Sequence, residues 1–313
     1  MEHIFIINPV SGTTNPETIL RPTIKQAAAK LSLPYQIITT EYPGHAKEIA
    51  KKLASSSKPI RFYACGGDGT LNEVIEGSLG YDNVETACVP CGSGNDFVRN
   101  FGTKEEFLDL ENLMQGQGFA IDLIKTEYGI ATAIASAGLD AEVAYGIPKF
   151  RRLPFCGGET AYKLSILTCI CGHIGHHLRI KADDEIFEGE YLLLAICNGK
   201  TYGGGFKAAP QADMQDGLLD LVIIKKVSRL RIAKVVGKYQ QGLHIVDGQV
   251  IPELADAITY RCVRNVEIET LDRKNIVVNQ DGECAPRKEL HATIAPFATK
   301  IVLPKSICER SNS

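Results

Sequence analysis

Short apolar runs alternate with helical patterns through the first third of the chain. Apolar residues are nearly continuous at 3–8, 35–39, 61–65 and 85–89, as in strands that are buried on both faces of a parallel sheet. Between them, residues 16–31, 44–54, 70–78 and 94–101 have the pattern of helices. Strands that alternate with helices predict a doubly wound, mostly parallel sheet with helices on both faces.

The pattern changes after about residue 125. Strand-like segments lie at 178–182, 190–197, 218–225, 266–271, 276–278 and 290–295, and only 162–173 and 227–241 have a helical pattern. This predicts an antiparallel, β-sandwich-like second domain. We expect an α/β domain at residues 1–125, completed by a strand near 297–313, and a β-rich domain at 126–296, with the active site in the cleft between them.

Composition narrows the class of protein. The chain has 313 residues, of which 44% are hydrophobic, so it can form a folded core. The 34 basic residues against 37 acidic ones give a net charge of −3, which argues against a nucleic-acid partner. The sequence has no uncharged apolar run of about 20 residues, which a membrane span would need. Its amino terminus also lacks the pattern of a secretory signal. These features predict a cytoplasmic protein.

The ten cysteines are scattered through apolar segments, which predicts reduced and mostly buried thiols. Two groups have the residue types of a metal site. One is Cys88 with Cys91, and the other comprises Cys169, Cys171, His173, His176 and His177. The simpler interpretations are a turn beside a glycine-rich loop, and a buried helix whose end carries histidines.

The strongest chemical signal is Gly66-Gly67-Asp68-Gly69-Thr70, which follows a predicted strand and opens a predicted helix. Consecutive glycines let backbone N–H groups approach a phosphate, and a helix N-terminus attracts anions. The segment lacks the Gly-Lys-Ser/Thr ending of a P-loop, and Asp68 would repel phosphate unless a cation lay between them. We therefore predict a nucleotide site bridged by Mg²⁺; the alternative is a turn in which Asp68 caps the helix.

Two more polar loops belong to the same predicted sheet edge. Pro90-Cys91-Gly92-Ser93-Gly94-Asn95-Asp96 follows one strand, Asn8-Pro9-Val10-Ser11-Gly12 follows another, and Thr40 ends a third. Ligands of α/β sheets bind beyond the carboxyl ends of the strands. Three such loops at one edge therefore favour a ligand site over ordinary turns.

Taken in order, these motifs resemble the diacylglycerol kinase catalytic-domain family, which includes bacterial soluble lipid kinases and the sphingosine and ceramide kinases. The resemblance covers nearly the whole chain. It rests on the three loops and on Gly44-His45-Ala46, Asn72-Glu73-Val74, Asn198, Gly203-Gly204-Gly205, Ala209-Pro210, Asp216-Gly217-Leu218-Leu219-Asp220 and Asp281-Gly282-Glu283.

The resemblance implies an ATP site and Mg²⁺. Asp68 and Asp96 would organise the catalytic Mg²⁺, and Asp213, Asp216 and the carbonyl of Leu218 would hold a structural one, the alternative there being a solvated acidic turn. Many relatives have Thr in place of Ser93, which keeps the hydroxyl. The residues implied for ATP are Asn8, Pro9, Ser11, Gly12, Thr40, Gly66, Gly67, Asp68, Gly69, Thr70, Asn72, Glu73, Gly92, Ser93, Gly94 and Asn95.

The family's catalytic acid corresponds to Asp281-Gly282-Glu283. If the strand continued through this segment, Asp281 and Glu283 would point to one face. One carboxylate is expected to accept the proton of the substrate hydroxyl and the other to orient the site or bind metal, with Asp68 helping to place ATP. Which carboxylate has which role stays open. From the residues alone, the alternative is an Asp-Gly hairpin turn.

The implied reaction is ATP-dependent phosphorylation of a lipid alcohol, in the first place diacylglycerol to phosphatidic acid. No residue pattern separates diacylglycerol from sphingoid bases, other lipid alcohols or a small polyol. A peripheral membrane contact is expected at residues 149–155, where basic and apolar residues interleave, the alternative being an ordinary exposed loop. Bacterial relatives often pair through the second domain, which makes a homodimer a further expectation.

Two other functions were weighed. An NAD kinase would share the Gly-Gly-Asp-Gly turn and the two-domain plan, but it should lack the Gly-Ser-Gly-Asn-Asp loop and the terminal Asp-Gly-Glu. A non-catalytic nucleotide-binding regulator would have no use for a base such as Asp281 or Glu283.

Overall fold

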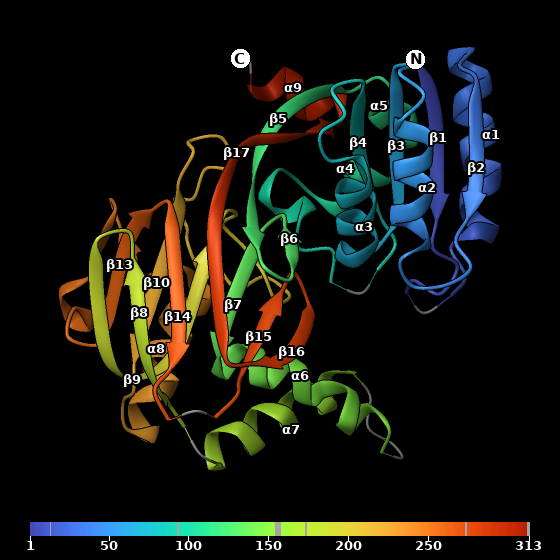
Figure 1. Cartoon of the computed structure of the whole chain (residues 1–313). Helices are drawn as coiled ribbons and strands as arrows, with labels where there is room; N and C mark the ends of the chain where they lie inside the picture. Colours follow the sequence, from blue (N-terminus) through green and yellow to red (C-terminus); the bar gives the residue numbers. More distant parts are fainter. Residues whose placement is uncertain (13, 93, 154–157, 173, 273, 312–313) are drawn as a thin grey trace. The chain divides into compact units, whose positions relative to one another are not determined.

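The computed structural model describes residues 1–12, 14–92, 94–153, 158–172, 174–272 and 274–311. The chain falls into two compact units, here called unit 1 (Met1–Leu123 with Pro296–Ser313) and unit 2 (Ile124–Ala295) (Figure 1). The chain passes from one unit to the other within strand β5 (Gln117–Thr126) and again within β17 (Glu289–Leu303). Four residues singled out in the sequence lie outside the described residues: Ser93, Pro154, Phe155 and His173.

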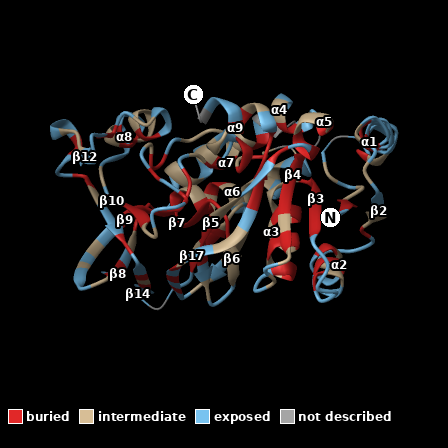
Figure 2. Ribbon diagram, turned by 90° about the horizontal axis from the view of Figure 1, so that it is seen from above, coloured by how far each residue is buried: buried red, intermediate tan, exposed pale blue. Residues whose placement is uncertain are grey.

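Unit 1 contains a parallel sheet in the order β2-β1-β3-β4, and residues 301–302 of β17 pair in parallel with β4. All residues of β3 are buried, as expected for a strand covered on both faces (Figure 2). The last strand expected from the sequence therefore pairs with the α/β sheet. The four other strands are β1 (Glu2–Ile7), β2 (Tyr35–Thr39), β3 (Ile60–Gly66) and β4 (Val84–Pro90).

Helices cover both faces of this sheet, which confirms the predicted doubly wound arrangement. Figure 2 shows α2 and α3 on one side of β3 and β4, and α1, α4 and α5 on the other. The helices of unit 1 are α1 (Glu17–Leu31), α2 (His45–Ala54), α3 (Asp68–Ser78), α4 (Lys104–Leu108), α5 (Leu110–Met114) and α9 (Lys305–Ser311).

The helix expected at residues 94–101 is wrong. Only a short 3-10 helix, η1 (Val98–Asn100), forms there. Asn95 has a φ of 54°, a left-handed conformation that a right-handed helix cannot continue through. The N–H groups of Asp96 and Phe97 are bound by the carboxylate of Asp68 instead of serving a local helix.

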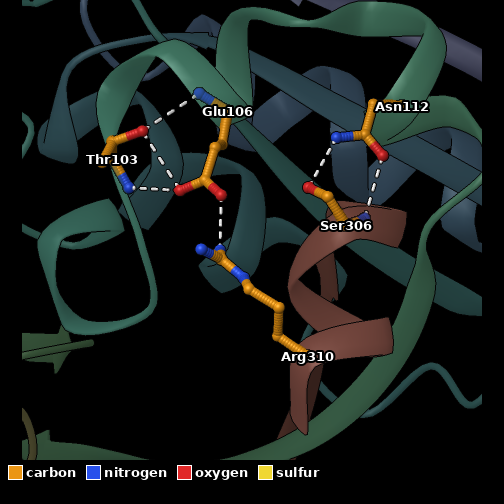
Figure 3. A network of polar contacts seen from close by, with 5 residues as sticks. All are labelled: Thr103, Glu106, Asn112, Ser306 and Arg310. Carbon is orange, nitrogen blue, oxygen red and sulfur yellow. Dashed lines mark hydrogen bonds and ion pairs between the residues drawn. The ribbon is translucent and has the colours of Figure 1, made fainter. Parts of the chain in front are cut away.

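The C-terminal helix α9 is fastened to unit 1 by paired side chains (Figure 3). Asn112 Nδ2 donates to Ser306 Oγ at 2.8 Å, and the Ser306 N–H donates to Asn112 Oδ1 at 3.0 Å. The guanidinium of Arg310 binds the carboxylate of Glu106. Ile307 is 5% exposed and adds apolar contact. The described end of the chain is therefore part of the fold of unit 1.

Unit 2 is built on an antiparallel sheet in the order β16-β15-β7-β9-β8-β14, with β10 between β9 and β13. Residues 289–293 of β17 pair with β14. The remaining strands are β6 (Gly129–Ala131), β7 (Ile134–Gly138), β8 (His176–Ala182), β9 (Glu185–Cys197), β10 (Leu219–Lys225), β11 (Ile245–Val246), β12 (Gln249–Val250), β13 (Ile258–Val263), β14 (Asn265–Thr270), β15 (Ile276–Gln280) and β16 (Glu283–Arg287).

Both faces of the central strands of unit 2 are buried. Along β9, Leu194 and Ile196 belong to one apolar cluster, whereas Leu193 and Ala195 belong to another. Because successive side chains of a strand point to opposite faces, the sheet lies between two cores. The predicted antiparallel, sandwich-like domain is thereby confirmed.

The helices of unit 2 are α6 (Leu139–Arg151), α7 (Gly158–Cys171), α8 (Arg229–Gln241) and the short η2 (Pro252–Leu254). The sequence pattern predicted α7 and α8 but missed α6. A Cβ on Gly146 of α6 would lie 2.4 Å from Ser165 Oγ of α7, so a glycine lets the two helices pack closely. Within the described ranges, no helix is long and apolar enough to cross a bilayer.

Candidate active site

Three loops at the carboxyl ends of β1, β3 and β4 touch one another through their glycines. A Cβ on Gly12 would lie 2.5 Å from the carbonyl oxygen of Cys91, and one on Gly92 would lie 2.6 Å from the Cα of Gly67. Neither separation is possible for a real Cβ. Gly12 also has a φ of +80°, which favours glycine. The structure thus brings the three predicted loops together at one edge of the sheet.

Side-chain bonds fix the first two loops to each other. Asn8 Nδ2 donates to Thr70 Oγ1 at 3.1 Å, and Thr70 is 5% exposed. A Cβ on Gly66 would lie 2.3 Å from the same Thr70 Oγ1. Pro9, Ser11 and Gly69 lie in the same pair of loops, half-buried or exposed. The loop after β1 is therefore held against the first turn of α3.

Asp68 connects the second loop with the third. Its Oδ2 accepts the N–H of Asp96 and its Oδ1 that of Phe97, both at 3.1 Å. It stands in the first turn of α3, where the helix dipole favours a negative charge, and no side chain caps that helix end. Asp96 in turn lies 3.5 Å from Arg99. Asp68 therefore holds the third loop in place and also contributes a negative charge to the candidate site.

Other residues predicted for ATP are engaged by the backbone. Asn95 is 4% exposed and its Oδ1 accepts the N–H of Gly92 at 2.9 Å. The carboxylate of Glu73 accepts the N–H groups of Gly44 at 2.9 Å and Ala46 at 3.2 Å, at the start of α2. These two side chains shape the loops, as does the buried Thr40, whose N–H donates to the Ile7 carbonyl at 2.9 Å.

The Asp281–Glu283 segment of unit 2 is a tight hairpin turn. Asp281 and Gly282 have φ angles of 44° and 98° between the antiparallel strands β15 and β16. Two successive positive φ values are typical of the Asp-Gly turns that join such strands. The strand does not continue through this segment, so the condition under which Asp281 and Glu283 would share one face is not met, and the alternative of an Asp-Gly hairpin turn is confirmed.

The carboxylate of Asp281 is surrounded by donors from the segment before β7. It accepts the Thr132 hydroxyl at 2.7 Å, the N–H of Ala133 at 3.1 Å and that of Ile134 at 2.9 Å, as well as the Thr132 N–H. Thr132 itself is fully buried. Sequence reasoning missed these partners, which are 147 to 149 residues away, and no local pattern marks them.

Glu283 has the opposite environment. It is exposed at the start of β16, and its side chain forms no hydrogen bond or ion pair with the residues that the structure describes. A carboxylate with its lone pairs available can accept a proton, whereas Asp281 uses its lone pairs to hold the turn. The two acids of the predicted catalytic pair therefore differ sharply in what they can do.

The acidic loop before β10 holds its carboxylates in local turns. Asp213 Oδ1 accepts the Gln215 N–H at 3.0 Å, and Asp216 Oδ1 accepts the Leu218 N–H at 2.9 Å. Burial raises the pKa of Asp220 to about 6, although its bond with the Tyr260 hydroxyl opposes this shift. The structural Mg²⁺ site expected at this loop stays a prediction.

As far as their residues are described, the cysteine and histidine groups show no metal geometry. Burial raises the pKa of Cys88 well above its ordinary value, and that of Cys91 to about 11. His176 Nε2 lies 2.8 Å from a carboxylate oxygen of Glu142. Across the described residues, no group of three or more His, Cys, Asp or Glu side chains gathers as metal ligands.

Comparisons with known proteins agree for both parts of the chain. The model of the diacylglycerol kinase catalytic domain matches residues 2–126, and that of the YegS C-terminal NAD kinase beta sandwich-like domain matches residues 133–303. A diacylglycerol kinase of Bacillus subtilis (strain 168) is 29% identical over 284 residues, which cover 89% of this chain and 88% of the relative. A probable lipid kinase YegS-like of Shewanella frigidimarina (strain NCIMB 400) is 31% identical over 244 residues, 76% and 75% of the two chains.

A crystal structure of a putative diacylglycerol kinase from Bacillus anthracis str. Sterne has the same fold. It superposes with a TM-score of 0.73 at 21% identity and covers 98% of both chains. The fold, the three glycine loops and the matches along both units lead to one conclusion: the chain belongs to the diacylglycerol kinase catalytic-domain family.

Proposed function

We propose that the chain is an ATP- and Mg²⁺-dependent lipid kinase that phosphorylates a hydroxyl of a lipid alcohol, with diacylglycerol as acceptor and phosphatidic acid as product. Family membership and relatives named diacylglycerol kinase support this choice. The observation that carries the proposal is the contrast within one turn: Asp281 is saturated with hydrogen bonds and Glu283 is exposed without a partner among the described residues.

The glycine loops suit the triphosphate of ATP. At Gly12, Gly66 and Gly92 no Cβ fits, so the three loops pack closely at one edge of the sheet, with the Gly92 N–H bound by Asn95 Oδ1. The uncapped N-terminus of α3 adds a dipole that attracts phosphate.

The donor set at the third loop also suits Mg²⁺. A Cβ on Gly94 would lie 3.5 Å from Oδ2 of Asp68 and 3.8 Å from Oδ2 of Asp96, so both carboxylates face one small space. Mg²⁺ is commonly held by one or two carboxylates together with phosphate oxygens. In that place it would neutralise charge on the phosphate oxygens of the nucleotide.

The residues of the chain divide the work of phosphoryl transfer. The glycine loops and the α3 N-terminus hold the triphosphate, while Asp68 keeps the second and third loops together. Glu283 accepts the proton of the attacking hydroxyl and releases it to solvent, to which it is exposed. Asp281 fixes the turn that carries Glu283 by holding the segment 132–134.

Turnover with a panel of acceptors tests this function. The purified chain is incubated with radiolabelled ATP and mixed micelles of diacylglycerol, a sphingoid base or monoacylglycerol, and separately with glycerol and with NAD. We expect label in phosphatidic acid, and its loss when Mg²⁺ is chelated. Label on NAD alone, or on none of the alcohols, would refute the proposal.

A peripheral membrane contact fits the end of α6. The surface formed by Lys149, Phe150, Arg151, Arg152 and Leu153, here called the basic helix end, carries exposed basic residues beside Leu153, which is 50% exposed. Leu167 of α7 is 57% exposed. Basic residues near an anionic bilayer contribute about 1 kcal/mol each. We infer that this surface meets an anionic bilayer.

Vesicle sedimentation tests the contact. The double variant Arg151→Glu/Arg152→Glu should bind phosphatidylglycerol-containing vesicles at least about tenfold more weakly than the unaltered chain. The matched control Lys51→Glu/Lys52→Glu makes the same charge change on exposed residues of α2. Equal binding by both variants, or equal binding of the unaltered chain to neutral vesicles, would refute the contact.

A further inference from the structure

A buried amide lies directly behind the turn that carries Glu283. Asn279, near the end of β15, is 5% exposed. Its Oδ1 accepts the N–H of Gly282 at 2.8 Å and the thiol of Cys284 at 3.5 Å. Because the Gly282 N–H can only donate, the amide oxygen must face the turn and the amide nitrogen must face away from it.

The other end of the amide is also fixed. Asn279 Nδ2 donates to Ser136 Oγ at 3.2 Å, and Ser136 is fully buried on β7. Asn279 stands opposite Ser136 in one strand pair and opposite Cys284 in the next. The amide therefore spans three neighbouring strands, with the turn at one end and the sheet interior at the other.

A buried carboxyl lies behind Ser136. Both carboxyl oxygens of Asp140 are inaccessible to solvent and have no hydrogen-bond partner among the described residues. Burial raises the pKa of Asp140 to about 6, while the nearby hydroxyls of Ser136 and Tyr202 oppose this shift. Since Ser136 Oγ already accepts from Asn279, its own proton is available to this carboxyl. The hydrogen-bonded chain thus runs from Ser136 through Asn279 to Gly282, and Asp140 lies beside its buried end.

Unit 1 contains an amide–hydroxyl pair that resembles Asn279 and Ser136. It consists of Asn112 and Ser306, and its role is purely structural, because it only fastens α9 (Figure 3). The pair in unit 2 differs because its amide binds the backbone between Asp281 and Glu283.

Building on the kinase activity proposed above, we propose that Asn279 is a positioning residue: it holds the Gly282 N–H and so directs the carboxylate of Glu283, with Ser136 fixing the orientation of the amide. Asp281 holds the turn from one side through residues 132–134, and Asn279 holds it from the other. The turn is thereby restrained in direction as well as in place.

Kinetics of a double-mutant cycle test the role. Asn279→Ala should lower kcat about 100-fold, because a misplaced catalytic group loses that much, and should leave the KM for ATP unchanged. In a Glu283→Gln background the same change should cost less than about threefold, since the group it directs is already gone. Asn112→Ala, the matched control, should lower the melting temperature without changing kcat per folded molecule.

Hydrogen exchange gives a readout without substrate. The Gly282 amide should be protected in the unaltered chain and should exchange faster in Asn279→Ala, whereas Asn112→Ala should leave it protected. Equal losses of kcat in both backgrounds, an unchanged kcat in Asn279→Ala, or unchanged Gly282 protection would each overturn the positioning role. An unaltered chain that labels no alcohol would instead overturn the kinase proposal.

Discussion

Two carboxylates of one turn show how strongly the surroundings of a residue decide its use. Asp281 accepts hydrogen bonds from three consecutive backbone N–H groups and a hydroxyl, whereas Glu283 is exposed two positions later. Hydrogen bonds to a carboxylate occupy the lone pairs that would accept a proton. Asp281 is therefore suited to hold structure and Glu283 to move a proton.

Substitutions that keep the shape of each side chain separate these roles. Glu283→Gln should lower kcat by about 10²- to 10⁴-fold with an unchanged melting temperature, because only the proton acceptor is lost. Asp281→Asn should lower the free energy of unfolding by about 2–4 kcal/mol, since an NH₂ group would face N–H donors. Urea unfolding and steady-state kinetics check both; a stable Asp281→Asn beside a fully active Glu283→Gln would reverse the assignment.

The buried Asp140 makes stability depend on pH. Its pKa in the folded chain is about 6, above the ordinary value of 3.8, so the folded state binds the proton more tightly. Its contribution is therefore fully present below about pH 4 and is lost as the pH rises through about 6. Between these two pH values the free energy of unfolding should fall by at most about 3 kcal/mol on account of Asp140.

Asp140→Asn should abolish this part of the pH dependence. The groups that face Asp140 are Tyr162, Cys197, Tyr202, Tyr239 and Cys284, whose pKa values are all raised, so none of them titrates between pH 4 and 7. Urea unfolding at several pH values should show the variant gaining stability relative to the unaltered chain as the pH rises. A constant difference between the two proteins would contradict the prediction.

At the scale of elements, the three glycine loops behave as one packed unit. Gly92 touches Gly67 and Gly12 touches Cys91 where no side chain fits, and Asp68 adds two hydrogen bonds across the second and third loops. A change in one loop must therefore shift another.

Two Gly→Ala substitutions should differ in effect: one should weaken ATP binding and the other should raise stability. Gly92→Ala places a Cβ 2.6 Å from the Gly67 Cα, so it should separate the loops and weaken ATP binding at least about tenfold. Gly237→Ala lies within α8, where the added Cβ would meet no described atom within 4 Å apart from its neighbours and the helix's own backbone, and it should stabilise unit 2 by about 0.5–1 kcal/mol. Calorimetric titration with ATP and thermal melting measure the two effects; unchanged ATP affinity in Gly92→Ala would contradict the packing argument.

The sequence predicted those elements whose cause is local. Apolar runs marked the buried strands, and glycines at strand ends marked the loops, because both signals lie within a few residues. The helix expected at 94–101 failed because Asp68, from another loop, binds the N–H groups that it needed. Helix α6 was missed because Gly146 and Pro148 weaken its pattern, although contact with α7 stabilises it.

For the candidate site, too, the sequence indicated the residues that local motifs mark and missed those that only the fold brings near. The motifs mark Asp68, Asp281 and Glu283 as candidate site residues, which stays a prediction, but they do not mark the partners of Asp281, which lie 147 to 149 residues earlier in the chain. The buried Asn279 was missed for a similar reason, since only the pairing of β15 with β7 and β16 gives its amide partners. Contacts of this kind follow from the fold and leave no local pattern.

At the scale of the whole molecule, unit 1 depends on the last described helix. Ile307→Ala should lower the free energy of unfolding by about 2–4 kcal/mol, because its side chain is 5% exposed against unit 1. Arg310→Ala should cost less than about 1 kcal/mol, since the side chain of Arg310 is 62% exposed and surface ion pairs contribute little. Chemical unfolding compares the two; a larger loss from Arg310→Ala would show that the ion pair, and not apolar contact, fastens α9.

Unit 1 is assembled from both ends of the chain, Met1–Leu123 and Pro296–Ser313, with all of unit 2 inserted between them. A ribosome makes the chain from the amino terminus, so β17 can take its place beside β4 only when nearly every residue has left the exit tunnel. Unit 1, although begun first, is therefore the unit that the nascent chain completes last. The sheet that carries the three glycine loops therefore lacks its β17 neighbour until all of unit 2 has been made.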